Sequence, residues 1–180
     1  MIEIHAYAIV SADDRIADAD GDMPTGLLND ADWRYFQSEL DRCDITVLGR
    51  ISHEAAPNLR NRRRIVMSSR AERLERRDDA WWWNPAAMPW EDVARELLPN
   101  GGRVGAPGGQ GPFDYFLKRG LTAFHLSRAR QVTLPGGRGL FAAVEKGVRA
   151  EDVLRDAGFR AGATTAMDEA AGVDLTIWRR

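Results

Sequence analysis

The hydrophobic and polar positions along the chain form two kinds of pattern, one typical of strands and one typical of helices. Short apolar runs rich in β-branched residues indicate strands, and segments with an apolar stripe at every third or fourth position indicate helices. The two kinds of segment succeed one another through most of the sequence, which is typical of an α/β layered protein. The pattern therefore predicts a central sheet with helices packed against it.

The ends of these segments are marked by turn and cap residues. Strands are predicted at residues 2–10, 44–49, 64–68, 80–84, 103–106, 121–128, 159–167 and 173–179. Helices are predicted at residues 31–41, 90–98 and 151–157, and a further helix begins at Pro112 and is ended by Gly120. Asn29 or Asp30 can cap the first helix. The last two strands are expected to form an antiparallel pair.

Residues 11–28 form a long polar segment between the first strand and the first helix. The segment is rich in Asp and also holds Gly21, Pro24 and Gly26, so it is predicted to be irregular. Irregular segments of this length are often functional.

Composition narrows the class of protein. The 180 residues fit one domain, residues 1–180, and 44% hydrophobic with 29% charged residues is globular. The formal net charge of -2 provides no field that would attract nucleic acid or an anionic membrane. No apolar run could cross a bilayer, no export signal is visible, and the single Cys43 cannot form an internal disulfide. We therefore expect a soluble, cytoplasmic enzyme or binding protein.

Three predicted strands run into turns that suit an anion. The pair Gly108-Gly109 lies between a strand and a helix, where backbone amides and the helix dipole favour a phosphate. The other two turns, at residues 49–52 and 68–70, each add a guanidinium and hydroxyls. Each could be a plain turn by itself. Because ligands of open α/β sheets bind at the carboxyl ends of strands, together the three turns predict a dinucleotide site.

A carboxylate is the other candidate for chemistry. Asp32 lies one turn before Phe36 on the predicted helix, at the edge of its apolar stripe, and Asp30 competes with it for a place in a pocket. A first-turn Asp favoured by the helix dipole is the alternative. The histidines lie on separate segments without ligand spacing, so no metal site is predicted.

In this order the segments resemble the dihydrofolate reductase superfamily, and most of all stand-alone relatives of the reductase domain of the bifunctional riboflavin-biosynthesis deaminase/reductases. The matching motifs, in chain order, are Asp13-Asp14-Arg15-Ile16-Ala17, Asp32-Trp33 with Phe36, Gly49-Arg50-Ile51-Ser52 with Glu54, Val66-Met67-Ser68-Ser69-Arg70, Gly108-Gly109 through Phe116-Leu117, and the closing strand Asp174-Leu175-Thr176-Ile177-Trp178. The resemblance covers nearly the whole chain.

The resemblance implies a three-layer α/β/α dihydrofolate-reductase-like fold, with a mostly parallel central sheet that ends in an antiparallel C-terminal pair. It implies NADPH as the cofactor and hydride transfer to a small heterocyclic or ribosylamine-type substrate, as in the 5-amino-6-(5-phosphoribosylamino)uracil reductases. The residues that it assigns to the cofactor are Arg50, Ser52, Ser68, Ser69, Arg70, Gly108, Gly109, Gln110 and Gly111. It places Asp32 where the family has its substrate-anchoring, catalytic carboxylate.

The chain also departs from the family pattern. The family has Asp-Gly in the first loop where this chain has Asp14-Arg15, and it usually has Trp shortly after Met-Pro, where this chain has Met23-Pro24-Thr25-Gly26. These departures disfavour dihydrofolate itself. They also keep open a nucleotide-binding protein of the same fold without turnover. The expected partners are a small-molecule substrate and optionally a second copy of the chain, with no nucleic acid and no membrane.

Overall fold

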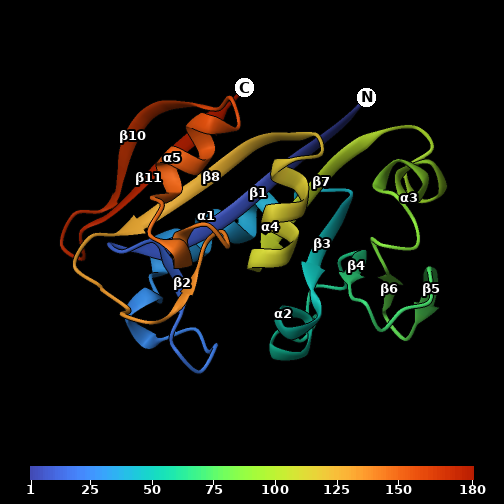
Figure 1. Ribbon diagram of the computed structural model, residues 1–180, viewed down its shortest axis with the longest axis horizontal. Coiled ribbons are helices and arrows are strands. Elements are labelled where there is room, and N and C mark those ends of the chain that lie inside the picture. The colour runs from blue at the N-terminus through green and yellow to red at the C-terminus, as the bar shows by residue number, and fades with distance from the viewer.

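A computed structural model describes residues 1–180 and contains a nine-stranded sheet in the order β10-β11-β8-β1-β7-β3-β4-β6-β5 (Figure 1). The strands are β1 Ile2–Ser11, β3 Ile45–Gly49, β4 Arg64–Met67, β5 Leu74–Arg77, β6 Ala80–Trp83, β7 Gly102–Gly108, β8 Leu121–Ala129, β10 Arg160–Asp168 and β11 Val173–Arg179. The six strands from β8 to β6 are parallel to their neighbours in that set, and β11 pairs antiparallel with both β8 and β10. The predicted parallel sheet with an antiparallel C-terminal pair is confirmed.

Helices cover both faces of this sheet. They are α1 Asp30–Leu40, α2 Arg50–Ala55, α3 Trp90–Leu97, α4 Gln110–Leu117 and α5 Ala150–Asp156. Helices α4 and α5 lie in front of the sheet in Figure 1, and α1 lies behind it. Two short 3-10 helices, Thr25–Leu27 and Val144–Lys146, complete the helical segments.

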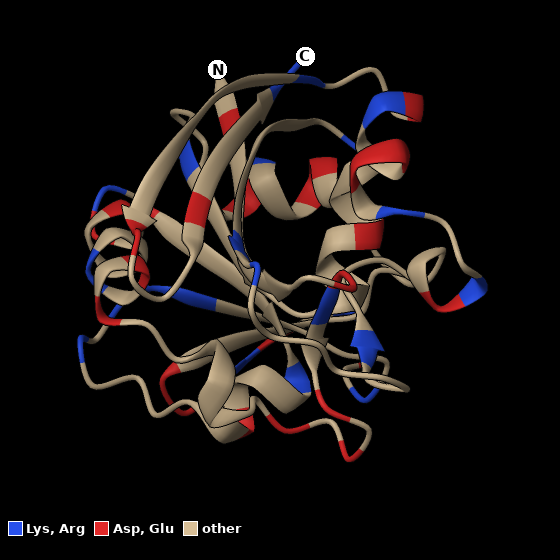
Figure 2. Ribbon diagram, turned by 90° about the vertical axis from the view of Figure 1, so that its left-hand side faces the viewer, with Lys and Arg blue, Asp and Glu red and all other residues tan.

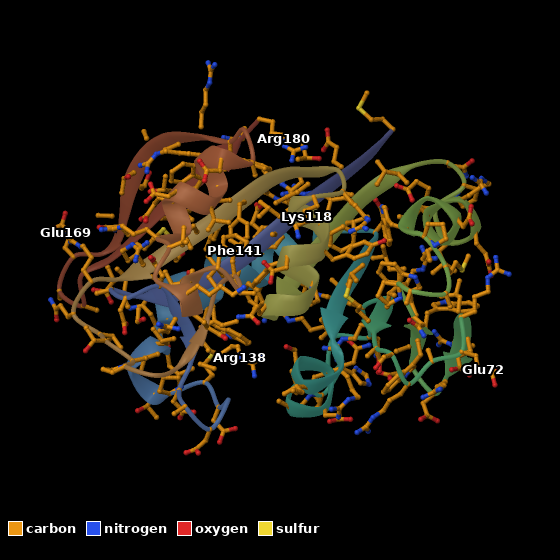
Figure 3. The ribbon with its side chains drawn as sticks, in the orientation of Figure 1. Glu72, Lys118, Arg138, Phe141, Glu169 and Arg180 are labelled. Carbon is orange, nitrogen blue, oxygen red and sulfur yellow. The ribbon has the colours of Figure 1, made fainter.

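The main hydrophobic core fills one face of the sheet. It contains 28 buried residues, which come from the sheet, from α3, α4 and α5 and from the segments around them, and none of them belongs to α1. Phe141 is fully buried in this core, and Figure 3 shows it between α4 and α5. Alternation along β1 explains the asymmetry, because Ile4, Ala6 and Val10 point into this core while His5 and Tyr7 point toward the other face.

Several element boundaries differ from those predicted. Helix α4 begins at Gln110 rather than at Pro112, because Gly109 already has the cap position. The polar segment 11–28 contains a short strand, β2 Arg15–Ala17, which pairs with β9 Arg138–Gly139 to form a separate two-stranded sheet. Strand β5 was not predicted, because its sequence is mostly charged.

Charges of both signs are distributed over the surface. Figure 2 shows blue and red segments interleaved along the helices and loops of this view, consistent with the net charge of -2. No helix combines the length and the apolar content that a membrane crossing requires.

Candidate functional site

The three anion-friendly turns lie side by side at the carboxyl end of the sheet. Strands β7, β3 and β4 are neighbours, with Leu48 paired to Gly108 and Gly49 paired to Met67. Paired residues of adjacent strands are about 5 Å apart. The turn at Gly108-Gly109, the turn after Gly49 and the turn after Met67 therefore form one continuous edge, which we call the turn edge.

Glycine is needed at the centre of the turn edge. Gly108 has a φ of 131°, a backbone conformation that L side chains rarely adopt, and the peptide bond between Gly108 and Gly109 is cis. A Cβ atom on Gly109 would lie 3.6 Å from the Ser52 hydroxyl and 3.9 Å from the Ile16 side chain. These contacts place Ser52, from α2, and Ile16, from β2, directly beside the glycine pair.

Helix α4 starts at this glycine pair and presents its N-terminus to it. Gly109 is the cap residue and provides no side chain to bind the first amides of the helix. Uncapped amides at a helix N-terminus, with the positive end of the helix dipole, bind anions. Gly111 is exposed, and a Cβ placed on it would meet no atom within 4 Å.

Gln110, which the resemblance assigns to the cofactor site, also bonds to the segment around β9. Its side-chain amide donates to the Gly139 carbonyl at 3.0 Å and to the Glu145 carboxylate at 2.8 Å. Glu145 also accepts from the Gly139 amide at 3.2 Å. Gln110 thus ties the start of α4 to the glycine-rich segment around β9.

The two cationic turns differ in how free their side chains are. Arg50 forms hydrogen bonds to both carboxylate oxygens of Glu54, at 2.8 and 2.6 Å, and Arg50 with Arg70 lowers the pKa of that carboxyl. Ser68 is buried, and its hydroxyl accepts from the Arg70 amide at 3.1 Å, so it shapes the turn. Ser69 and Arg70 are exposed and remain open to a ligand.

Asp32 lies at the same end of the sheet on the opposite face from α4. Asn29 caps α1 by accepting from the amides of Ala31 and Asp32, both at 3.1 Å. This cap leaves Asp30 exposed while Asp32 is half-buried. Burial raises the pKa of the Asp32 carboxyl, and the Ser127 hydroxyl of β8 opposes the rise as a hydrogen-bond donor.

The sequence did not identify Ser127 as a neighbour of Asp32, nor His125 as part of a polar cluster. His125 and Ser127 are two residues apart on β8 and so share the face toward α1, while Phe124 and Leu126 point into the core. Two of the histidines that lie on separate segments are in contact, with His5 Nδ1 3.1 Å from His125 Nε2. The alternation of polar and apolar residues along β8 is the signal that could have revealed this face.

Asp14, in the first loop, holds its backbone in an unusual conformation. It has a φ of 63°, a left-handed conformation that few side chains other than Asn and Asp adopt. Its buried carboxylate forms an ion pair with Arg128 at 2.6 Å and accepts from the Ala150 amide, at the start of α5, at 3.0 Å. The carboxylate thus fastens the first loop to β8 and α5.

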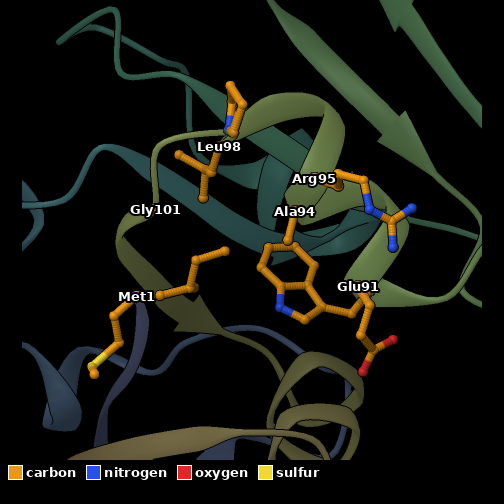
Figure 4. Close-up of a pocket in the computed structure, with 9 residues that line it drawn as sticks. Met1, Glu91, Ala94, Arg95, Leu98 and Gly101 are labelled. Atoms are coloured by element: carbon orange, nitrogen blue, oxygen red, sulfur yellow. The ribbon is translucent and has the colours of Figure 1, made fainter.

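A hollow lies away from these groups, near the first residues of β1 and β7. It has a volume of about 460 Å³ and is lined by Met1, Ile2, Trp90, Glu91, Ala94, Arg95, Leu98, Pro99 and Gly101. Figure 4 shows side chains of α3 on one side of it and Met1 on the other. It lies at the opposite end of the parallel strands from the turn edge and shares none of its residues.

Known structures of the same architecture were found over the full chain. A dihydrofolate reductase from Enterococcus faecalis, complexed with NADP(H) and RAB-propyl, matches with a TM-score of 0.68 at 19% identity, covering 99% of this chain and 96% of that one. A putative riboflavin biosynthesis protein from Shewanella sp. PV-4 matches with a TM-score of 0.68 at 16% identity, covering 99% of both chains.

A bifunctional diaminohydroxyphosphoribosylaminopyrimidine deaminase/5-amino-6-(5-phosphoribosylamino)uracil reductase from Thermotoga maritima matches with a TM-score of 0.67 at 14% identity. The match covers 99% of this chain and 56% of that one, so this chain spans about half of the bifunctional protein. No protein-family model matches the sequence, and no curated protein does. The chain therefore has the dihydrofolate-reductase-like fold, which confirms the predicted resemblance at the level of the fold.

Proposed function

We propose that the chain is an NADPH-dependent reductase acting on a small heterocyclic or ribosylamine-type substrate. The observation that carries the proposal is the turn edge, where three anion-friendly turns adjoin at the carboxyl ends of parallel strands. A dinucleotide has several phosphates in an extended arrangement, which suits such a row of sites. A solved dihydrofolate reductase of the same fold holds NADP(H), which supports a nicotinamide cofactor.

The residues of the turn edge fit this group. The uncapped start of α4 and the bare backbone of Gly108 and Gly109 suit a pyrophosphate, and the Ser52 hydroxyl lies beside them. Exposed Ser69 and Arg70 suit the additional phosphate that distinguishes NADPH from NADH. When bound, the cofactor supplies a hydride.

Asp32 is the residue proposed to hold the substrate. A carboxylate accepts two parallel N–H bonds, as the edge of an aminopyrimidine offers them. Burial raises its pKa, which favours the protonated carboxyl that gives a proton to the reduced substrate. Arg50, Ser52 and Ser68 complete the set by binding phosphate or shaping the turns that do.

A matched pair of glycine variants tests the cofactor site. Gly109→Ala would place a methyl group 3.6 Å from the Ser52 hydroxyl, inside the proposed site, whereas Gly111→Ala would add one where nothing lies within 4 Å. We expect Gly109→Ala to weaken NADPH binding at least about tenfold, a loss of about 1.4 kcal/mol. Gly111→Ala should bind like the wild type in a fluorescence titration. Absence of NADPH binding by the wild-type protein at millimolar concentration would refute the proposal.

Turnover separates the reductase from a binding protein of the same fold. We expect NADPH to be consumed with at least one member of a panel of pterins and ribosylaminopyrimidines, and Asp32→Asn to reduce that rate while leaving NADPH affinity unchanged. Binding without turnover on the whole panel would favour the alternative, a nucleotide-binding protein that has lost catalysis.

A further inference from the structure

Helix α1, which holds Asp32, is attached to the sheet by polar contacts rather than by the main core. No residue of α1 belongs to the 28-residue hydrophobic cluster. Instead Glu39 pairs with Arg103 at 2.5 Å, and the Tyr35 hydroxyl lies 2.5 Å from His125 Nδ1. Leu40 is also buried and Phe36 lies edge-on to Tyr7, so these polar contacts fix the position of α1 together with a small apolar contact. Hydrogen bonds are the more directional of the two.

A chain of hydrogen bonds continues from Tyr35 into the sheet. His125 Nε2 lies 3.1 Å from His5 Nδ1, and the Arg103 guanidinium lies 3.2 Å from the same His5 nitrogen. Arg103 also donates to the Tyr7 hydroxyl at 2.8 Å. The chain thus joins α1 to strands β8, β1 and β7.

The Tyr35 hydroxyl sets the direction of the hydrogen bonds in this chain, because a phenol donates more readily than it accepts, so His125 Nδ1 accepts from it. A neutral imidazole has one donor and one acceptor, so His125 Nε2 carries the proton that lies between the two rings, and His5 Nδ1 accepts it. Burial, followed by the charges of His5 and Arg103, lowers the pKa of His125 to about 3, which keeps the ring neutral.

The same two elements hold the substrate-anchoring carboxylate. Asp32 is one helical turn before Tyr35 on α1, and Ser127 is two residues after His125 on the same face of β8. Tyr35 lies at His125, and Ser127 acts on the Asp32 carboxyl as a hydrogen-bond donor. A shift of α1 at Tyr35 therefore moves Asp32 relative to Ser127.

We propose that His125 is a positioning residue, which as the Nε2–H tautomer holds Tyr35 and so keeps the Asp32 carboxylate at Ser127. The importance of Asp32 to the reaction rests on the function proposed above, whereas the contact itself does not. The role differs from packing, because an apolar residue of the same size could fill the space but could not accept from Tyr35.

The test uses three variants that separate the two sides of the imidazole. The side-chain oxygen of Asn reaches the position of Nδ1, so His125→Asn keeps an acceptor for Tyr35 and loses the bond to His5. The amide nitrogen of Gln reaches the position of Nε2, so His125→Gln keeps the bond to His5 and loses the acceptor. Tyr35→Phe removes the hydroxyl and leaves the ring.

The readout is the titration of the Asp32 carboxyl, followed by NMR in protein labelled at the aspartate carboxyl carbons. We expect the Asp32 pKa to fall by about 0.5 in Tyr35→Phe and in His125→Gln, as α1 shifts and water reaches the carboxylate. His125→Asn should keep the wild-type value. Tyr115→Phe, which removes a hydroxyl bonded at 3.3 Å to the Trp90 amide on the other face, is the control and should also keep it.

An Asp32 pKa that stays at the wild-type value in Tyr35→Phe, while the thermal midpoint falls, would overturn the proposal and leave a structural role. Nitrogen chemical shifts showing the Nδ1–H tautomer of His125 would overturn it as well. NADPH binding is measured on the same samples. A failure to bind NADPH would refute the proposed function and leave the comparison of Asp32 titrations valid.

Discussion

Asp14 combines an unfavourable backbone conformation with a buried carboxylate that anchors the first loop. Its φ of 63° is tolerated better by Asp than by most residues, because its short side chain can bond locally. Here the carboxylate instead reaches Arg128 and the Ala150 amide. Arg128 in turn donates to the Ser11 carbonyl at 3.0 Å and pairs with Glu151 at 2.6 Å. Contacts with Arg128 and α5 thus offset the unfavourable conformation of Asp14.

Removal of this carboxylate should be costly. We expect Asp14→Ala to lower the free energy of unfolding by about 1–3 kcal/mol, because it leaves the buried Ala150 amide without its acceptor, removes one of the two carboxylates that pair with Arg128, and keeps a strained φ. Asp14→Gly should lose about 1 kcal/mol less, since glycine adopts this φ without strain. Urea denaturation measures both. Asp20→Ala, an exposed change in the same loop, is the control, and equal losses in all three variants would contradict the assignment.

His125 should make the protein sensitive to acid. Its pKa is lowered from 6.5 to about 3 by burial and by nearby His5 and Arg103. Above pH 6.5 the ring is neutral in both states and contributes nothing. Between 6.5 and about 3 only the unfolded chain takes up the proton, so stability falls as the pH falls, by up to about 1.4 kcal/mol for each pH unit.

Urea unfolding from pH 7 to pH 4 checks this dependence against His125→Asn. The variant lacks the titrating ring, so its loss of stability on acidification should be smaller than that of the wild type. Identical slopes would show that other groups dominate.

Contacts between distant residues could not be predicted from spacing along the chain. His5 and His125 are 120 positions apart, and their contact follows from β1 and β8 being neighbours in the sheet. By contrast, Asp32 and the turn at Gly108-Gly109 were identified because each has a local pattern of its own. Sequence patterns indicated which residues carry chemistry, and the strand order decided which of them meet.

At the scale of elements, strand β5 shows how a neighbour can override composition. Its residues Leu74–Arg77 are mostly charged and predict a solvated face. They form a strand because they pair antiparallel with β6, where Arg76 faces Trp81 and Arg77 faces Ala80. The Arg77 guanidinium also lies 4.7 Å from the Trp82 ring centre, a cation–π contact. The stabilising partner is therefore the next strand, which no local pattern of β5 reveals.

Helix α1 should open more easily than α4. Helix α4 contributes Phe113, Phe116 and Leu117 to the main core, whereas α1 contributes none of its residues. Local opening costs less where few apolar contacts are lost. We expect the amide hydrogens of α1 to exchange at least about tenfold faster than those of α4 in native-state hydrogen exchange. Equal protection would show that the polar contacts hold α1 as firmly as the core holds α4.

At the scale of the whole molecule, the proposed cofactor site and the proposed substrate site lie on different faces of the sheet. The face toward α3, α4 and α5 holds the apolar core, and α4 presents its N-terminus to the turn edge. The face toward α1 holds Asp32 and the polar contacts of Tyr35, His125 and Arg103. The fold could be predicted because both layers follow from periodic patterns. The division could not, since it depends on which side each strand residue faces.

This division predicts that the two halves of the site can be altered independently. Gly109→Ala should weaken NADPH binding and leave the Asp32 pKa unchanged. Tyr35→Phe should lower the Asp32 pKa and leave NADPH binding unchanged. The groups belong to different helices on opposite faces, so the stability losses of the double variant should equal the sum of the single losses within about 0.5 kcal/mol. A larger interaction energy in a urea double-mutant cycle would mean that the sheet transmits changes between its faces, and that cofactor and substrate sites are coupled before either ligand binds.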